Sequence, residues 1–358
     1  MTAAAPLRPP EGRQGPGPMP GALLRVLDLA LARRAGGTLP GDHLAPGAGT
    51  GTELVQLRPY VVGDDVRQLD PAATARTGVP HVRLQVPERA LTTWIVLDVT
   101  PSMAFGTASR LKADVAEGVA LAVSRLATRR GGRAALLRAG AGERMLPPRG
   151  GRNAQLAIAR AVGEGVSPDA SAATGSGTAG AAGRGTAAPG EAGGPGRGSA
   201  PAPRGPAEPG PLARALVRAG RVARRPGLVV VISDFREEGW RAPLAELGAR
   251  HSLVAVEIRD RREAELPRAG QLALVDPETG ALVEIDSSIV RVRERYAALE
   301  AERRESVAAG LRAARAEHIV LDTAHDWLRE LGRGLDPRRG RRRATRGGPA
   351  PRADGAAA

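Results

Sequence analysis

The stretch Thr92–Val99 reads TTWIVLDV, and the later stretches Leu228–Ser233 and Leu253–Ile258 read LVVVIS and LVAVEI. Short, continuous apolar runs of this kind are typical of strands that are buried on both faces of a parallel sheet. Residues 108–129 lie between the first two runs, and their apolar side chains recur at helical spacing. Buried strands that alternate with helices predict a doubly wound α/β domain with a mainly parallel sheet.

Weaker patterns extend this prediction along the chain. Further strands are expected at 55–60, 81–86, 134–139 and 318–321, and further helices at 22–34, 153–162, 212–222, 240–249, 288–315 and 324–331. The turn sequence DPETG at 276–280 predicts a surface hairpin over residues 271–285.

Composition excludes several classes of protein. The 358 residues include no cysteine, which rules out disulfide frameworks, thiolate nucleophiles and cysteine-ligated zinc. No apolar run reaches the 18 or more residues of a membrane span, and residues 1–21 lack the apolar stretch of a signal peptide, so we expect a cytoplasmic protein. The formal charge is +14, but Lys112 is the only lysine, and the abundance of arginine matches a GC-rich coding bias. The charge is therefore weak support for a polyanionic partner.

Composition also divides the chain. Residues 1–20 and 336–358 are expected to be disordered tails, and residues 21–90 a separate N-terminal segment. Residues 167–210 have no apolar periodicity, so burial cannot offset the entropy of ordering them. We expect them to be a disordered insertion within an α/β domain over 91–335, because neither side alone makes a complete sheet. A linker between two domains is the alternative.

The candidate site lies where the predicted strands end. Asp98 closes the first buried strand and is followed by Thr100 and Ser102, while Asp234 follows LVVVIS. Ligands of open α/β sheets bind at the carboxyl ends of the strands, and a set of carboxylates and hydroxyls suits Mg²⁺ or Mn²⁺. The structural alternative is that Asp98, with Ser102, and Asp234 cap the turns or helices that follow them.

Common catalytic motifs are missing. A Walker A loop needs Gly before Lys-Ser/Thr, but Lys112 stands in RLKA. No G-x-S-x-G elbow follows a strand, and the histidines have no metal-ligand spacing. An aspartyl phosphatase needs a second Asp where Thr100 stands. A metal-dependent hydrolase at the Asp98 crevice is the least favoured interpretation, because no general base or activated nucleophile is evident.

Two motifs resemble known families. The pattern Asp98-x-Thr100-x-Ser102 resembles the metal-ion-dependent adhesion site of von Willebrand factor A domains. Residues 58–70 (RPYVVGDDVRQLD) and 75–78 (ARTG) resemble the signature of the bacterial domain-of-unknown-function-58 family. The likeness runs from about Leu23 to Leu335. It implies a von Willebrand factor A-like domain, an adaptor role without catalysis, and a MoxR-type AAA+ ATPase as partner, whose carboxylate would complete the coordination of the ion.

The chain departs from these patterns at two positions. Pro71 stands where the signature has tryptophan. In the adhesion site a threonine from a Gly-Gly-Thr-Asn-like loop supplies the third hydroxyl, and the matching stretch here is GGRN at 150–153, which places Arg152 at that position. A guanidinium repels a divalent cation. Arg152 is therefore expected either to weaken metal binding or to pair with Asp98 or Asp234 as a fixed charge in place of the ion.

The signature and the C-terminal tail each have two interpretations. The signature residues are Arg58, Tyr60, Gly63, Asp64, Asp65, Arg67, Asp70 and Arg76. Their arginines and aspartates are expected to form an ion-pair network that pins the N-terminal segment onto the α/β domain; the alternative is that the signature forms part of a partner-binding face. The tail cluster predicts binding to nucleic acid or an acidic membrane surface, or else a solvated tail; it comprises Arg338, Arg339, Arg341, Arg342, Arg343 and Arg346. No aromatic residue is interleaved with the tail cluster for base stacking.

Overall fold

The computed structural model describes residues 12–24, 27, 53–62, 64–86, 91–129, 131–140, 143–167, 209–276 and 281–335. Several predictions fall outside these ranges. They concern the C-terminal tail with its arginine cluster, most of the N-terminal tail, most of the helix at 22–34, nearly all of the insertion, Gly63 and the turn at 277–280.

A six-stranded sheet forms the centre of the molecule, in the order β10-β7-β6-β3-β4-β5. Its strands are β3 (Thr92–Asp98), β4 (Arg133–Ala139), β5 (Arg144–Gly150), β6 (Leu228–Ser233), β7 (Ser252–Arg259) and β10 (Glu317–Asp322). All neighbours run parallel except β5, which is antiparallel to β4. The prediction of a mainly parallel sheet is confirmed, and this arrangement is that of a von Willebrand factor A-like domain.

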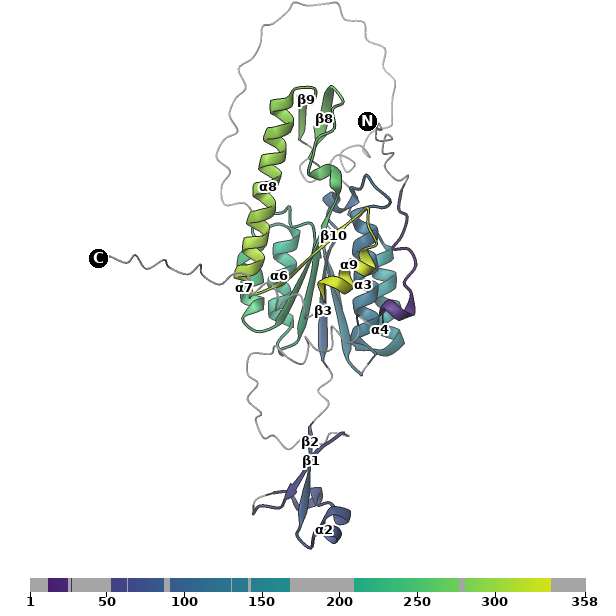
Figure 1. The fold of residues 1–358 in the computed structure, drawn as a ribbon, viewed down its shortest axis with the longest axis vertical. Coiled ribbons are helices and arrows are strands. Elements are labelled where there is room, and N and C mark those ends of the chain that lie inside the picture. The colour runs from purple at the N-terminus through teal and green to yellow at the C-terminus, as the bar shows by residue number, and fades with distance from the viewer. Residues whose placement is uncertain are drawn as a thin grey trace, which may run out of the picture.

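Helices cover both faces of the sheet (Figure 1). One face packs against α3 (Lys112–Ala127), α4 (Gly151–Gly163) and α9 (Trp327–Gly334), and the other against α6 (Pro211–Val222), α7 (Arg241–Gly248) and α8 (Val290–Ala313). Alternate residues of each central strand enter the two cores, which is why residues 94–97 and 228–232 are apolar throughout. β3 pairs with β4 on one side and with β6 on the other, so the chain on both sides of residues 168–208 contributes to one sheet.

Strand β5 was not expected from the sequence. Arg144–Gly150 reads RMLPPRG, and two consecutive prolines argue against a strand inside a sheet. β5 is the edge strand, however, where a missing N–H costs no ladder hydrogen bond on the open side. Helix α3 is also shorter than predicted, since it begins at Lys112 rather than near residue 108.

Two small hairpins complete the described strands. β1 (Glu53–Pro59) pairs antiparallel with β2 (His81–Val86), and the short elements η1 (Val66–Gln68) and α2 (Pro71–Thr77) lie between them. The predicted surface hairpin is β8 (Gln271–Val275) with β9 (Leu282–Asp286). Figure 1 shows β8 and β9 beyond the sheet, beside the first turns of α8. Two further short elements, η2 (Pro101–Ala104) and η3 (Arg261–Glu263), follow β3 and β7.

Residues 12–24, which we call the N-terminal strap, lie across α3 and α9. The carbonyl oxygen of Pro16 accepts hydrogen bonds from Arg110 Nη1 at 2.7 Å and Trp327 Nε1 at 2.8 Å. Gly118 makes this approach possible, because a Cβ there would lie 2.4 Å from the Trp327 ring and 2.9 Å from Pro16. The amides of Gln14 and Gly15 both donate to the fully buried carboxylate of Asp114, at 3.0 Å each.

Candidate functional site at the carboxyl edge of the sheet

The carboxyl edge, where the five parallel strands end, brings the predicted site residues together. Asp98 Oδ1 accepts from the amide of Thr100 at 2.9 Å and from its hydroxyl at 2.6 Å, and Thr100 Oγ1 lies 3.1 Å from Ser102 Oγ. Asp98 Oδ2 accepts from Ser233 Oγ at 2.5 Å, which ties β3 to β6 beside Asp234. All of these side chains are buried. Asp98 thus accepts from a backbone amide two residues on, and Asp234 does the same with the amide of Arg236 at 3.1 Å; each holds the turn that follows it, but neither caps η2 or α7.

Lys112 is the residue that sequence reasoning missed. It opens α3 with no measurable exposure, and its Nζ lies 2.6 Å from Asp234 Oδ2 and 2.6 Å from Glu263 Oε1. Glu263 belongs to η3, so one ammonium joins α3, the end of β6 and the segment after β7. The one available signal was that Lys112 is the only lysine in the chain.

The two aspartates have opposite pKa shifts. Burial, together with the charge of Asp234, raises the pKa of Asp98 from 3.8 to about 7. Burial also acts to raise the pKa of Asp234, but the Lys112 ammonium outweighs it and lowers that pKa below its usual value. Burial acts to lower the pKa of Lys112, yet Asp234 and Glu263 together raise it. The buried pair is therefore an ammonium and a carboxylate, while Asp98 favours its neutral form.

These contacts do not suit a divalent cation. Asp234 would have to face the ion, but it already binds an ammonium at 2.6 Å, and that positive charge would repel Mg²⁺ or Mn²⁺. Both oxygens of Asp98 already have amide or hydroxyl partners. Within the described ranges, no three acidic or histidine side chains are grouped so as to hold one metal ion.

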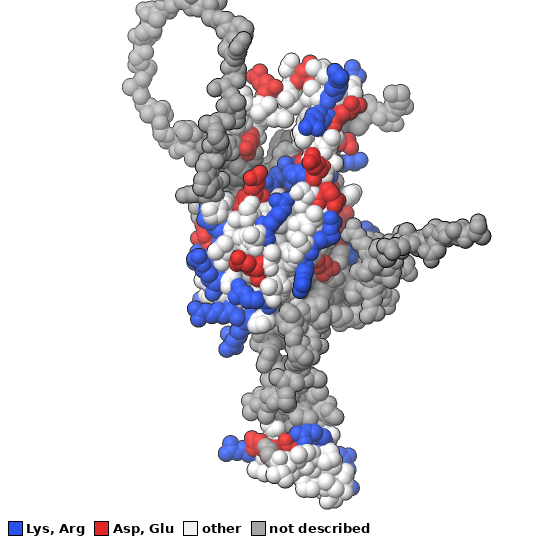
Figure 2. All heavy atoms as spheres, turned by 90° about the vertical axis from the view of Figure 1, so that its left-hand side faces the viewer, with Lys and Arg blue, Asp and Glu red and all other residues white. Residues whose placement is uncertain are grey.

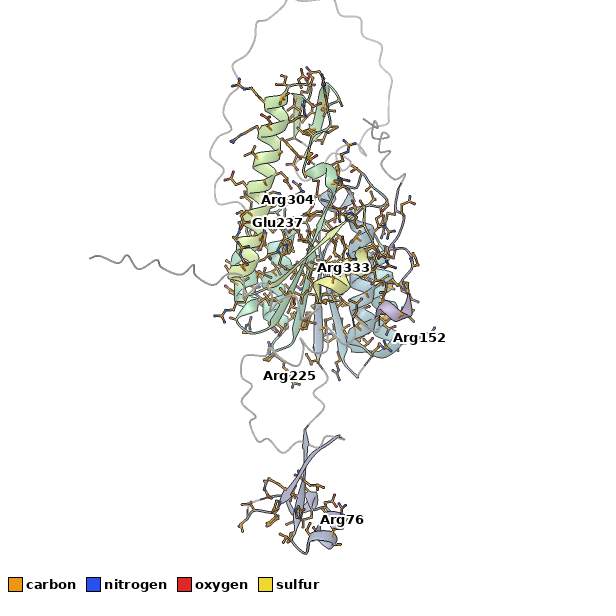
Figure 3. All side chains as sticks on the ribbon, viewed as in Figure 1. Arg76, Arg152, Arg225, Glu237, Arg304 and Arg333 are labelled. Atoms are coloured by element: carbon orange, nitrogen blue, oxygen red, sulfur yellow. The ribbon has the colours of Figure 1, made fainter. Side chains whose placement is uncertain are left out.

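The structure contradicts the expected role of Arg152. Because β5 is antiparallel, Gly150 pairs with Arg133 at the start of β4, whereas Asp98 pairs with Ala139 at the end of β4. The seven residues of β4 separate these points by about 20 Å. Arg152 is exposed and lies in the first turn of α4, at the end of the sheet where the parallel strands begin. Figure 3 shows it far from Glu237, which follows Asp234 closely in the chain. Arg152 therefore pairs with neither aspartate.

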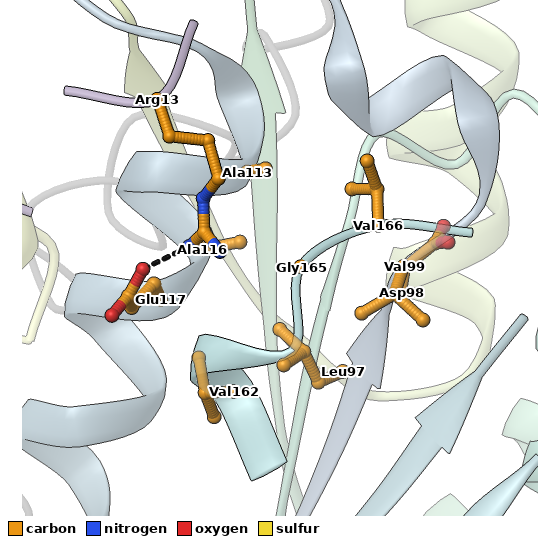
Figure 4. Close-up of a pocket in the computed structure, with 10 residues that line it drawn as sticks. All are labelled: Arg13, Leu97, Asp98, Val99, Ala113, Ala116, Glu117, Val162, Gly165 and Val166. Carbon is orange, nitrogen blue, oxygen red and sulfur yellow. Dashed lines mark hydrogen bonds and ion pairs between the residues drawn. The ribbon is translucent and has the colours of Figure 1, made fainter. Parts of the chain in front are cut away.

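A small pocket opens beside Asp98 on the α3 side of the sheet (Figure 4). Its lining is mostly apolar and includes Leu97, Val99 and Val166. Arg13, from the N-terminal strap, reaches the pocket but points toward Glu117, with which it forms an ion pair. The strap thus borders the site without supplying a counter-ion to Asp98.

A ring of ion pairs surrounds the Lys112 centre. Arg236 Nε donates to Glu263 Oε1 at 3.1 Å, and Arg236 also contacts Glu300 on α8 at 3.4 Å. Glu300 is held in turn by Arg303 and Arg304 at 2.9 and 3.0 Å. A further buried acid, Asp260 at the end of β7, accepts from the hydroxyls of Thr107 and Thr323. The acids of this edge are therefore held by internal donors.

The signature residues organise the N-terminal segment itself. Arg58 binds Asp64 through two hydrogen bonds of 2.7 and 2.8 Å, which lowers the pKa of Asp64. Asp65 accepts from the amide of Arg67 and caps η1, and Asp70 accepts from the amide of Ala73 and caps α2. These contacts join parts of the β1–β2 unit to one another. We had expected them to join this unit to the α/β domain.

The remaining signature residues have equally local surroundings. The amide of Tyr60 donates to the carbonyl of Pro80, which closes the end of the β1–β2 hairpin. Arg76 donates to the carbonyl of Ala72 one turn earlier in α2. Pro71, which replaces the signature tryptophan, is the first residue of α2, where proline is well tolerated. A partner-binding role for this unit stays a prediction.

The shifted pKa of Asp98 predicts a pH-dependent stability. Between pH 3.8 and about 7, Asp98 holds its proton in the folded protein but loses it in the unfolded chain. Its contribution to the free energy of unfolding is therefore complete below pH 3.8 and is lost as the pH rises through about 7. Asn cannot ionise. Between about pH 5 and about pH 7, wild type should therefore lose stability relative to Asp98→Asn by roughly 1 kcal/mol per pH unit. Urea unfolding across this range measures the difference.

Asp286→Asn is the control for that experiment, because Asp286 accepts from the amide and hydroxyl of Ser288 as Asp98 does from Thr100, but at the surface. The pKa of Asp286 is lowered by these hydrogen bonds, so its contribution changes only below about pH 4. A difference between wild type and Asp98→Asn that stays constant with pH would contradict the raised pKa.

The order and direction of the sheet strands, with helices on both faces, define a von Willebrand factor A-like domain. The model of the family "Protein of unknown function DUF58" matches residues 56–306, and the chain belongs to this family. Similar relatives include the uncharacterized proteins Rv1480 of Mycobacterium tuberculosis and Mb1516 of Mycobacterium bovis. Each is 35% identical over 343 residues, covering 94% of this chain and 96% of the relative.

Solved structures show looser likenesses. The conserved hypothetical protein BatB from Bacteroides thetaiotaomicron has 11% identity and a TM-score of 0.37, covering 68% of this chain and 97% of its own. An aerotolerance-related membrane protein from Bacteroides fragilis has 12% identity and the same TM-score, covering 68% and 98%. In the part of this chain that is described, no helix has both the length and the apolar character to cross a bilayer.

Proposed function

We propose that this protein is a non-enzymatic interaction protein whose carboxyl edge binds a partner protein. The observation that carries the proposal is that the acids of this edge are already engaged by internal donors: Asp98 by Thr100 and Ser233, and Asp234 by Lys112. A general acid or base needs a free side chain near its substrate, and a nucleophile needs an adjacent base. The arrangement at this edge favours holding a shape over performing a reaction.

A MoxR-type AAA+ ATPase is the partner that we propose, on the strength of the family resemblance. Since Lys112 disfavours a divalent ion, we propose direct docking in place of a metal bridge to a partner carboxylate. Phe105 offers an anchor: it follows η2, its side chain is 42% exposed, and its ring lies 5.9 Å from Lys112 Nζ. Aromatic residues, Phe included, are enriched in protein interfaces relative to the rest of the surface.

Binding of the purified ATPase to immobilised full-length protein tests this proposal. Phe105→Ala should weaken binding about tenfold or more, because truncating a hot-spot aromatic removes at least about 1.4 kcal/mol of binding free energy. Leu156→Ala is the matched control, since Leu156 is 47% exposed on α4, away from the carboxyl edge. Equal binding by wild type and Phe105→Ala would remove the proposed docking site, and no binding by wild type would remove the proposed partner.

The alternative function, binding of nucleic acid or an acidic membrane through the C-terminal arginine cluster, concerns residues outside the described ranges and stays a prediction. It requires affinity that falls steeply with salt and is lost on deletion of 336–358. On the face that Figure 2 shows, arginine and acidic side chains are intermixed along α8, where Glu300 pairs with Arg303 and Glu305 with Arg312. This face does not favour a polyanion.

A further inference from the structure

Lys112 is exceptional in both sequence and structure. The chain has 52 lysine and arginine residues, and Lys112 is the only lysine among them. Its side chain is fully buried. All the remaining Lys and Arg positions carry arginine, and the single lysine lies where its positive charge is completely buried.

The geometry accounts for this choice. The ammonium is a compact charge with three donors, whereas the guanidinium is a wide, planar fork. Two donors of Lys112 are used at 2.6 Å, on Asp234 Oδ2 and Glu263 Oε1. The ring of Phe105 lies 5.9 Å from the same nitrogen, within cation–π range. A point charge coordinated closely by carboxylates resembles a bound metal ion more than a surface salt bridge.

We infer that Lys112 is a built-in cation that takes the place of the divalent ion expected at this edge, so that the site keeps its geometry without metal. The ion would have linked the loop after β3 to the loop after β6. Lys112 takes over the β6 side of this link, because it holds Asp234 after β6 to Glu263 of η3 from the first turn of α3, while the Ser233–Asp98 hydrogen bond joins β6 to the end of β3.

The surrounding contacts hold the carboxylate of Glu263 in place, as others hold that of Asp234. Glu263 Oε1 accepts from both Lys112 and Arg236, and Glu263 Oε2 accepts from the amide of Asp260 at 3.2 Å. Tyr296 on α8 donates to the carbonyl of Glu263 at 3.2 Å. The two anions of the centre therefore come from the residue after β6 and from η3, α8 holds η3 in place, and the positive charge comes from Lys112.

This inference concerns the protein alone and is independent of which partner it binds. Thermal unfolding of the full chain, in EDTA and in millimolar Mn²⁺ or Mg²⁺, tests it. Wild type should unfold at the same temperature in all three solutions, since the position of the ion is taken. Lys112→Met keeps the length of the side chain but leaves the carboxylates without a cation. It should unfold at a lower temperature in EDTA and recover several degrees in Mn²⁺.

Two further variants make the result specific. Lys112→Met/Asp234→Asn removes a carboxylate as well and should lose most of the recovery. Arg312→Met, which breaks an exposed pair with Glu305, should show no metal response. The inference is overturned if Mn²⁺ stabilises wild type but not Asp234→Asn, since the site would then bind metal with Lys112 present. It is also overturned if folded Lys112→Met ignores both metals. If Lys112→Met does not fold, wild type and Asp234→Asn still test the inference, which is overturned if Mn²⁺ raises the unfolding temperature of wild type but not that of Asp234→Asn.

Discussion

Asp234→Ala is expected to lower the free energy of unfolding by about 3–5 kcal/mol. The substitution leaves the buried Lys112 ammonium with Glu263 as its one remaining carboxylate, although its usual hydration is unavailable inside the protein. It also removes the acceptor of the Arg236 amide. Urea unfolding near neutral pH measures the loss, because the pKa of Asp234 is lowered and its carboxylate is fully ionised there.

Asp286→Ala is the matched control for this prediction, because Asp286 also accepts from an amide two residues on but lies on the β8–β9 hairpin without a buried cation. Asp286→Ala should lower the free energy of unfolding by about 1 kcal/mol. Lys112→Met/Asp234→Leu should recover part of the stability lost in Asp234→Ala, since replacing a whole buried ion pair by apolar groups is often nearly neutral. A cost of Asp234→Ala no larger than that of Asp286→Ala would contradict the role given to the pair.

Trp327→Ala is expected to cost a similar 3–5 kcal/mol, and to release the N-terminal strap as well. Trp327 is 2% exposed, packs in the core with α3 and donates to the carbonyl of Pro16. Its removal leaves a cavity between α3 and α9 and takes away one of the two donors that hold Pro16. Urea unfolding measures the first effect, and the rate of tryptic cleavage after Arg13 in the folded protein measures the second.

Trp240→Ala is the control that separates loss of stability from release of the N-terminal strap. Trp240 is 1% exposed and packs edge-on against Phe235 in the core on the other face of the sheet, away from the strap. It should destabilise the domain as much as Trp327→Ala without speeding cleavage after Arg13 under native conditions. If both variants speed that cleavage equally, global unfolding is its cause, and Trp327 has no special hold on the strap.

The centre of the fold could be predicted because its signals are local. β3, β6 and β7 are each a single apolar run, so burial on both faces can be recognised without knowing their neighbours. The proximity of Asp98 and Asp234 followed from the same prediction, because parallel strands end at one edge. No relation between distant residues had to be known beyond the direction of the strands.

The errors have two causes: one strand with an atypical sequence, and contacts between residues that are distant in sequence. The two prolines of β5 concealed the one antiparallel strand of the six-stranded sheet. The resemblance to the adhesion site placed the GGRN loop at the carboxyl edge, so Arg152 was assigned to the wrong end of the sheet. Lys112 is 122 positions from Asp234 and 151 from Glu263. No periodicity or motif connects residues so far apart, and only the packing of α3 against the sheet brings them together.

The N-terminal strap also has a consequence for how the chain matures during synthesis. Trp327 and Pro16 are 311 positions apart, so the hydrogen bond between them cannot form until the ribosome has made nearly the whole protein. Domains commonly fold in the order in which they are translated. Here the strap can contact Arg110 and Asp114 once that part of the chain is made, but its contact with α9 has to wait for Trp327. The strap is therefore attached in two stages, and the second joins the first described residues to the last described helix.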